Sequence, residues 1–176
     1  MKHSSGLTLL ELLLTLSVIA IMTLAGVPVF RDLLLNQRMT AHINGLVHAV
    51  FMAKHTAHTR LSTTTICKSR TGQQCEPQAE WSDGWLLFDN IDRDHPPRID
   101  AGEHILATGG SYPQGSIRAN RQAFIFRAFE IRSTNGTLVF CDPRGADHAK
   151  ALIISYSGRP RIALSRADGR PLKCPA

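Results

Sequence analysis

An uncharged stretch near the N-terminus constrains this chain more than any other feature of its sequence. Residues 12–30 carry no charged side chain, and the first charge after Glu11 is Arg31. A helix that crosses a bilayer needs about 20 mostly apolar residues, so this stretch is long enough to span a membrane. We therefore predict one membrane-spanning helix over residues 7–30.

Glu11 lies at the start of this apolar stretch. A carboxylate within a membrane-spanning helix costs about 2.5–3.5 kcal/mol on insertion scales, so such a residue is a candidate functional group. Cleavage of the chain after Gly6 would supply a cationic partner, because the new amine of Leu7 could lie beside Glu11 of a neighbouring copy. We therefore predict that Glu11 acts in assembly.

The first residues also form a processing pattern. A short basic leader ends at Gly6, an apolar residue follows, and Glu11 is the fifth residue after the leader. This pattern resembles the class III leader of type IV pilins and type II secretion pseudopilins; Pro28 matches their helix-kinking proline, whereas Leu7 replaces the usual Phe. The resemblance implies cleavage and N-methylation by prepilin peptidase, single-pass anchoring in the inner membrane, and assembly with other pilin subunits into a pilus at the cell surface. A secretory signal peptide cleaved near Ala25 and an ordinary signal anchor are the alternatives.

The chain after the membrane segment is predicted to form one α+β domain. An amphipathic continuation of the helix over residues 31–60 is indicated by the apolar positions Ile43, Leu46, Val47, Val50 and Phe51. A β-rich region over residues 61–176 follows, with strands expected near residues 63–67, 85–89, 104–107, 123–127, 137–141, 151–156 and 161–164. Asn135-Gly136 predicts a hairpin turn before the strand at residue 137. We expect the long helix to pack on an antiparallel sheet or two.

The segment Trp81-Ser82-Asp83-Gly84-Trp85, which leads to Phe88, has a cysteine pair before it and an acidic loop after it. This arrangement resembles the FimT/GspH family of minor pilins and pseudopilins along nearly the whole chain. The resemblance implies a type IV pilin-like fold.

Four cysteines predict two disulfides, because the N-terminal export signal indicates an oxidising compartment. Three pairings are possible, and we favour Cys67 with Cys75, which closes a short loop, and Cys141 with Cys174, which tethers the C-terminal tail. The cysteine spacings match no zinc ribbon or finger.

No motif in the sequence indicates catalysis, a cofactor or a metal site. Residues 89–103 contain five acidic residues and two basic ones, Arg93 and Arg98, for a net charge of −3. These acids are Asp89, Asp92, Asp94, Asp100 and Glu103. The glycine and the terminal glutamate of an EF-hand are missing at their spacing, so we expect a solvated acidic loop. The chain is predicted not to be an enzyme.

Positive charge gathers at the other end of the chain. Residues 155–176 carry five cations against Asp168, for a net charge of +4 out of +6 for the whole chain. The cations are Arg159, Arg161, Arg166, Arg170 and Lys173. Within Gly158-Arg159-Pro160-Arg161, an extended backbone would place both arginines on one side, about 7 Å apart, a spacing similar to that of successive DNA phosphates. Gly158 would permit a turn and a close approach of the backbone to a phosphate.

Gly158-Arg159-Pro160-Arg161 also matches the Gly-Arg-x-Arg motif with which FimT-type members bind DNA during natural transformation. The resemblance implies that Arg159 and Arg161 bind double-stranded DNA and support DNA uptake; charge and proximity add Arg166, Arg170 and Lys173. The alternative is a structural minor pilin, or a GspH-like pseudopilin of type II secretion, that acts in fibre assembly without DNA. Arginines on edge strands are compatible with both, since they also prevent aggregation.

Overall fold

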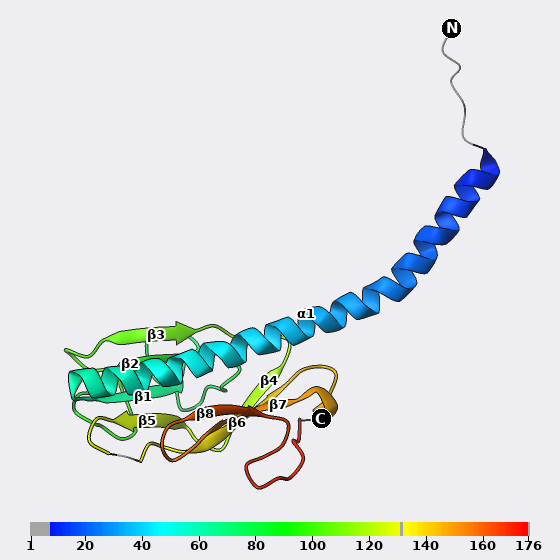
Figure 1. Cartoon of the computed structure of the whole chain (residues 1–176). Coiled ribbons are helices and arrows are strands. Elements are labelled where there is room, and N and C mark those ends of the chain that lie inside the picture. Colours follow the sequence, from blue (N-terminus) through cyan, green and yellow to red (C-terminus); the bar gives the residue numbers. More distant parts are fainter. Residues whose placement is uncertain (1–7, 131, 176) are drawn as a thin grey trace. The chain divides into compact units, whose positions relative to one another are not determined.

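The computed structural model describes residues 8–130 and 132–175 of the chain (Figure 1). The chain divides into two compact units, residues 1–38 and residues 39–176, which we describe separately. The elements, in chain order, are α1 Leu9–Arg60, β1 Thr63–Lys68, β2 Trp85–Asp89, β3 Ile105–Gly109, β4 Ser116–Ala119, β5 Ala123–Arg127, β6 Gly136–Cys141, η1 Ala146–His148, β7 Lys150–Ile154 and β8 Pro160–Ala163.

The first unit is the N-terminal part of α1. Thr8 precedes the helix, and its Oγ1 accepts a hydrogen bond of 3.3 Å from the backbone N–H of Glu11, which satisfies one free donor of the first turn. Pro28 lies inside the helix, and the apolar side chains from Leu9 to Phe30 are exposed. By length and composition this helix is able to cross a membrane.

The second unit begins with the rest of α1, which supplies one side of the core. The buried helix residues are Met39, Ile43, Leu46, Ala49, Val50, Ala53 and Ala57. Three of them are alanines, whose short side chains let strands approach the helix closely. The prediction for Phe51 is wrong, because its side chain is 55% exposed. Phe51 follows Ile43 by eight positions, which turns it about 80° further around the helix and away from the buried stripe.

Two antiparallel sheets complete the second unit (Figure 1). The first sheet has the strand order β3-β2-β1-β5, and the second has the order β4-β6-β7-β8. In Figure 1 the C-terminal part of α1, in cyan, runs alongside both sheets. The predicted α+β fold, a long helix packed on antiparallel sheets, is therefore confirmed.

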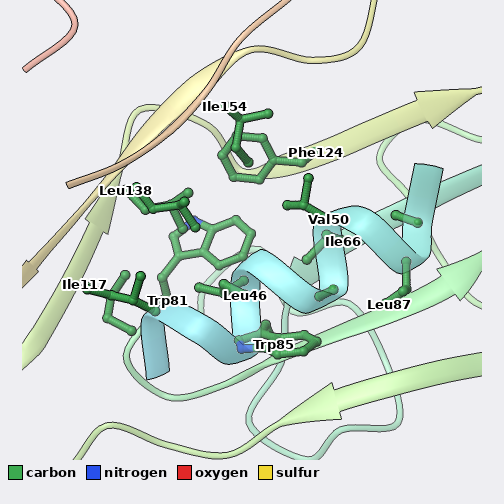
Figure 2. Packing of buried hydrophobic residues seen from close by; sticks show 14 of the residues in the cluster. Leu46, Val50, Ile66, Trp81, Trp85, Leu87, Ile117, Phe124, Leu138 and Ile154 are labelled. Atoms are coloured by element: carbon green, nitrogen blue, oxygen red, sulfur yellow. The ribbon is translucent and has the colours of Figure 1, made fainter. Parts of the chain in front are cut away.

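The main core lies between the helix and the two sheets (Figure 2). Trp81 and Trp85 pack beside Leu46 of the helix. Phe124 of β5 and Ile154 of β7 belong to the same core. The ring centroids of Trp81 and Phe124 lie 5.5 Å apart. Every member of the three buried clusters lies at residue 39 or later, so a fragment of residues 34–176 keeps the whole core of the second unit.

The strand pairing corrects one prediction and adds one strand. Asn135-Gly136 is not a hairpin turn, because β5 pairs with β1 in the first sheet whereas β6 pairs with β4 and β7 in the second. Gly136 is instead the first residue of β6, where a Cβ would lie 2.7 Å from Asn120 Oδ1 and 2.9 Å from the Phe124 ring. The glycine is needed for this close approach. β4 was not predicted.

Candidate nucleic-acid interface

The Gly-Arg-x-Arg segment joins β7 to β8 in a tight hairpin. The backbone N–H of Gly158 donates to the carbonyl of Ser155 at 2.8 Å, and the N–H of Ser155 donates to the carbonyl of Arg159 at 3.1 Å. Gly158 has φ +68°, the left-handed conformation that closes such a turn. The Lys54 ammonium donates to the carbonyl of Ser157 at 2.8 Å and ties the turn to α1.

Gly158 is buried in this hairpin and does not present its backbone to an incoming ligand. A Cβ at this position would lie 2.8 Å from Ser133 Oγ, 3.0 Å from Lys54 Cδ and 3.2 Å from the Phe126 ring. The close approach that requires glycine is therefore made to the protein's own side chains. The structure therefore gives Gly158 a role in shaping the turn, and direct contact of Arg159 and Arg161 with DNA stays a prediction.

Arg159, directly before β8, and Arg161, within β8, are both exposed. Arg161 pairs with Ile153 of β7, so the two side chains lie on the same face of the second sheet. This face is opposite to the main core; its buried side chains are Val139, Cys141, Ala151 and Ile153, and we call it the outer face. The Arg161 side chain therefore extends from the outer face. Arg159 lies two positions earlier in the chain.

The C-terminal tail, residues 164–175, covers part of the outer face. Leu172 is buried against the outer face, and Cys174 forms a disulfide with Cys141 of β6. Both disulfides have the pairing that we favoured from the sequence. A small turn in the tail is closed by the backbone N–H of Arg166, which donates to the carbonyl of Arg170 at 2.9 Å. The disulfide and Leu172 thus hold a basic segment against the sheet.

Between the tail and the first strand of this sheet lies an open groove with a volume of about 570 Å³. Its lining includes Arg118 of β4, Arg166 and Lys173 of the tail, and the polar side chains of Asn120 and Thr137. Arg118 pairs with Val139 and follows Ile117, which points into the main core, so Arg118 extends from the outer face. Three cations therefore surround one groove.

Arg118 was not among the residues predicted from the sequence. It lies far from the basic C-terminus in the chain, in a strand that was not predicted. The alternation of Ile117 and Arg118 becomes informative only when β4 is known to pair with β6. A single apolar residue in a four-residue strand gives no usable periodicity.

Five exposed cations on or beside the outer face have no partner in the part of the chain that the structure describes. Within residues 8–130 and 132–175, none of their side chains forms a hydrogen bond or an ion pair; we call Arg118, Arg159, Arg161, Arg166 and Lys173 the basic surface. Arg170 differs, because its Nε lies 3.4 Å from Asp168 Oδ2. The basic surface therefore includes four of the predicted binding residues and adds Arg118, whereas the charge of Arg170 is compensated.

A buried ion pair supports the strand that carries the tail's disulfide. The Asp142 side chain is fully buried, and its Oδ2 lies 2.5 Å from Nη2 of Arg144. Burial alone would raise the pKa of Asp142, but hydrogen bonds from the Arg144 side chain and backbone outweigh this effect and hold the pKa below its usual value. Burial also raises the pKa of Tyr112 to about 12, and the Asp142 carboxylate adds to that shift.

The remaining predicted site residues lie at the N-terminus. Gly6 and Leu7 are outside the described residues, so the cleavage site stays a prediction. Glu11 is exposed in the first turn of α1. Its role in assembly depends on a second copy of the chain and also stays a prediction.

Comparison with known families agrees with this architecture. Residues 42–158 match the family described as "Type II transport protein GspH", and residues 1–27 match the "Prokaryotic N-terminal methylation motif". The first match covers more than half of the sequence, and the chain belongs to the GspH family. It is a GspH/FimT-like protein with the fold of a minor type IV pilin, a structural rather than an enzymatic class.

Solved structures show the same fold. The chain is similar to the type IV minor pilin FimU of Pseudomonas aeruginosa strain PAO1, with a TM-score of 0.53 and 16% identity over 79% of this chain and 96% of that one. A second crystal form of FimU gives a TM-score of 0.52 and 16% identity over 77% and 98%. No curated protein sequence matches significantly. The family match ends at Gly158, so Arg159, Arg161 and the tail lie beyond it.

Proposed function

We propose that this chain is a minor type IV pilin that binds double-stranded DNA through its basic surface and supports DNA uptake in natural transformation. Prepilin peptidase would cleave after Gly6, and the apolar helix would anchor the protein in the inner membrane until it enters a pilus with other subunits. Retraction of the pilus would then draw bound DNA inward.

The observation that carries the proposal is the basic surface itself. Five exposed cations that have no partner among the described residues gather on or beside one face of the second sheet, although Arg118 and Lys173 are 55 positions apart in the chain. Unpaired guanidinium groups are suited to phosphate oxygens, which they bind through charge-assisted and often bidentate hydrogen bonds. A face held by a disulfide and a tight hairpin loses little conformational entropy on binding.

The dimensions of this surface suit a DNA backbone. Arg161 on β8 and Arg118 on β4 are three strand spacings apart, which corresponds to about 14 Å across the sheet. Each DNA strand carries one phosphate for every 3.4 Å of helix axis, so the surface spans about four nucleotides. Contacts of this kind give affinity with little sequence selectivity.

A gel-shift titration of duplex DNA tests the proposal, with oxidised residues 34–176 as the wild type. Arg159→Ala/Arg161→Ala should lower the affinity at least about tenfold, because each charge-assisted hydrogen bond contributes about 1.5–3 kcal/mol. The matched control Arg70→Ala/Arg98→Ala removes the same charge away from the basic surface and should stay within about twofold of the wild type. Absence of binding by the wild type, or equal losses in both variants, would refute the proposal.

A second candidate function, a structural subunit without DNA binding, is favoured by a different observation. β8 is an edge strand; Ile162 within it and Leu164 directly after it are 51% and 78% exposed. Exposed apolar residues on an unpaired edge suit contact with another subunit. Ile162→Asp with intact DNA binding but impaired entry into pili would show that the two roles use different residues.

A further inference from the structure

Three carboxylates that the sequence assigned to a solvated loop converge in the structure. Asp92, Asp94 and Asp100 lie in the connection between β2 and β3, and each offers an oxygen within 4.8 Å of the others. Oxygen ligands of calcium lie at about 2.3–2.6 Å from the ion, so two ligands of one ion are at most about 5 Å apart. The spacing of the three carboxylates therefore fits a single ion.

The charges of this cluster are not balanced by the protein. Within the described part of the chain, none of the three carboxylates forms an ion pair, although Arg93 and Arg98 are in the same loop. Like charges at such short separation repel one another. A cation at the centre would remove that repulsion.

A buried asparagine, Asn90, lies against this cluster. Its side chain is 1% exposed, and its Nδ2 donates to Asp94 Oδ1 at 3.1 Å, so the carboxamide is directed at the cluster. Its Oδ1 is buried and has no hydrogen-bond partner among the described residues. An orphaned buried carbonyl oxygen is costly and requires an explanation such as an ion.

Half a turn of the Asn90 carboxamide would direct its oxygen at the cluster, in place of the hydrogen bond from Nδ2 to Asp94. The turn exchanges Oδ1 and Nδ2, which brings the orphaned oxygen beside the Asp94 carboxylate. Two oxygens that face each other are unfavourable by themselves, but both become ligands when a cation lies between them. The same residue thus satisfies its oxygen and adds a fourth oxygen to the set.

The neighbouring carboxylates of Glu103 and Asp89 are bonded to other groups. They are therefore not part of this cluster. Both oxygens of Glu103 accept backbone hydrogen bonds, from Ile91 at 2.6 Å and from Asp100 at 3.1 Å. Asp89 pairs with Arg60 at 3.0 Å and accepts from the backbone N–H of His104. These bonds hold the two ends of the loop together, and among the described residues they leave the three carboxylates of the cluster without an ion-pair partner.

We propose that this loop binds one calcium ion through Asp92, Asp94, Asp100 and the side-chain oxygen of Asn90, with water in the remaining positions. A set made only of oxygens selects hard cations, and calcium tolerates irregular geometry better than magnesium, which demands a near-ideal octahedron. The site is independent of the basic surface. Its ion would link the two ends of the acidic loop in the calcium-rich medium outside the cell.

Isothermal titration of calcium chloride into oxidised residues 34–176 tests the site. We expect one site with a dissociation constant of about 10⁻⁴–10⁻³ M, the range of extracellular calcium modules, and weaker binding of magnesium. Asp100→Asn should weaken calcium binding at least about tenfold, since it removes one of three charged ligands. The control Asp168→Asn, in the exposed tail, should leave binding unchanged.

The variant Asn90→Asp tests whether Asn90 is a ligand of the ion or has only a structural role. It should strengthen calcium binding by adding a fourth carboxylate, whereas a residue with only a packing role would not improve affinity. Absence of heat and of any rise in melting temperature at about 10 mM calcium, tenfold above the weakest expected affinity, would overturn the proposal. Equal calcium binding by the wild type and Asp100→Asn would overturn it as well.

Discussion

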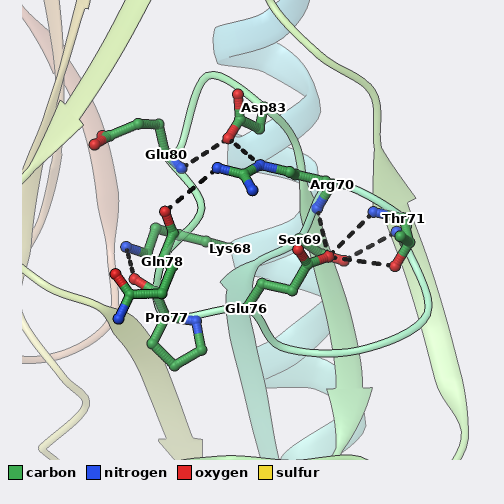
Figure 3. Close-up of polar contacts among 10 residues, drawn as sticks. Lys68, Ser69, Arg70, Thr71, Glu76, Pro77, Gln78, Glu80 and Asp83 are labelled. Carbon is green, nitrogen blue, oxygen red and sulfur yellow. Dashed lines mark hydrogen bonds and ion pairs between the residues drawn. The ribbon is translucent and has the colours of Figure 1, made fainter.

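The two disulfides of this protein lie in two polar regions that differ in how many of their cations have a partner. Beside the Cys67–Cys75 disulfide, both Lys68 and Arg70 have partners in the residues that follow the loop (Figure 3). There, Arg70 Nε lies 2.9 Å from Asp83 Oδ2, and the Lys68 ammonium donates to the Pro77 carbonyl at 2.7 Å. Glu76 accepts from the backbone N–H of Arg70 at 3.0 Å. Charges in this segment stabilise the segment itself.

The segment closed by Cys141 and Cys174 pairs Arg144 with Asp142, but its C-terminal part leaves cations without a partner among the described residues. Of its cations, Arg170 has a partner in Asp168, whereas Arg166 and Lys173 have none within the described residues. A cross-link that holds unpaired cations in place is suited to an external anion. On the proposal that the basic surface binds DNA, the first disulfide serves structure alone and the second also serves binding.

Removal of the two disulfides should have the largest effects and should separate these roles. Cys141→Ser/Cys174→Ser opens a link between residues 33 apart and should lower the free energy of unfolding by about 3.5 kcal/mol, and Cys67→Ser/Cys75→Ser, with a separation of 8, by about 2.5 kcal/mol. Only the first variant should also weaken DNA binding, because it releases Arg166 and Lys173. Urea unfolding measures the loss of stability, and gel shifts measure the loss of DNA affinity. Equal losses of DNA affinity in the two variants would contradict the difference between the two disulfides.

A smaller effect is expected at the hairpin that presents Arg159. Gly158→Ala would place a methyl group 2.8 Å from Ser133 Oγ in a residue with φ +68°, and should cost about 2–3 kcal/mol. The control Gly169→Ala has φ +81° but open space around it, and should cost only about 1 kcal/mol. Urea unfolding measures the loss in free energy of unfolding for each of the two variants. Similar costs would show that the contacts of Gly158 with its neighbours contribute nothing.

The pH dependence of stability should give the smallest effect. The pKa of Asp142 is held below its unfolded value, so the ion pair stabilises the fold above about pH 4, and this stability is lost as the pH falls through the lowered folded pKa. Asp142→Asn should therefore flatten the fall in melting temperature below about pH 4. Asp83, whose pKa is lowered by a backbone hydrogen bond from Glu80 and then by Arg70, is more exposed. Asp83→Asn should change the profile less.

The sequence predicted local features well. The apolar run, the helix end near Arg60 and seven of the strands follow from residue type and periodicity. Features that depend on distant partners were missed. β4 has one buried apolar residue, so only its pairing with β6 identifies it as a strand, and Arg118 was missed with it. Asn135-Gly136 has the composition of a turn, but the glycine is required by crowding from Asn120 and Phe124.

The candidate sites show the same limit. Arg159, Arg161 and the tail cations are close in sequence, and a motif and local charge were enough to select them. The convergence of Asp92 and Asp94 with Asp100, and the orphaned oxygen of Asn90, depend on how the loop closes. Spacing along the chain does not specify that closure.

The salt dependence of DNA binding tests the central claim most directly. The logarithm of the observed affinity falls against the logarithm of salt concentration with a slope of about −0.9 for each phosphate neutralised. If Arg159 and Arg161 each neutralise one phosphate, Arg159→Ala/Arg161→Ala should flatten the slope of residues 34–176 by about 1.8. An unchanged slope would contradict the claim that these arginines hold the DNA backbone.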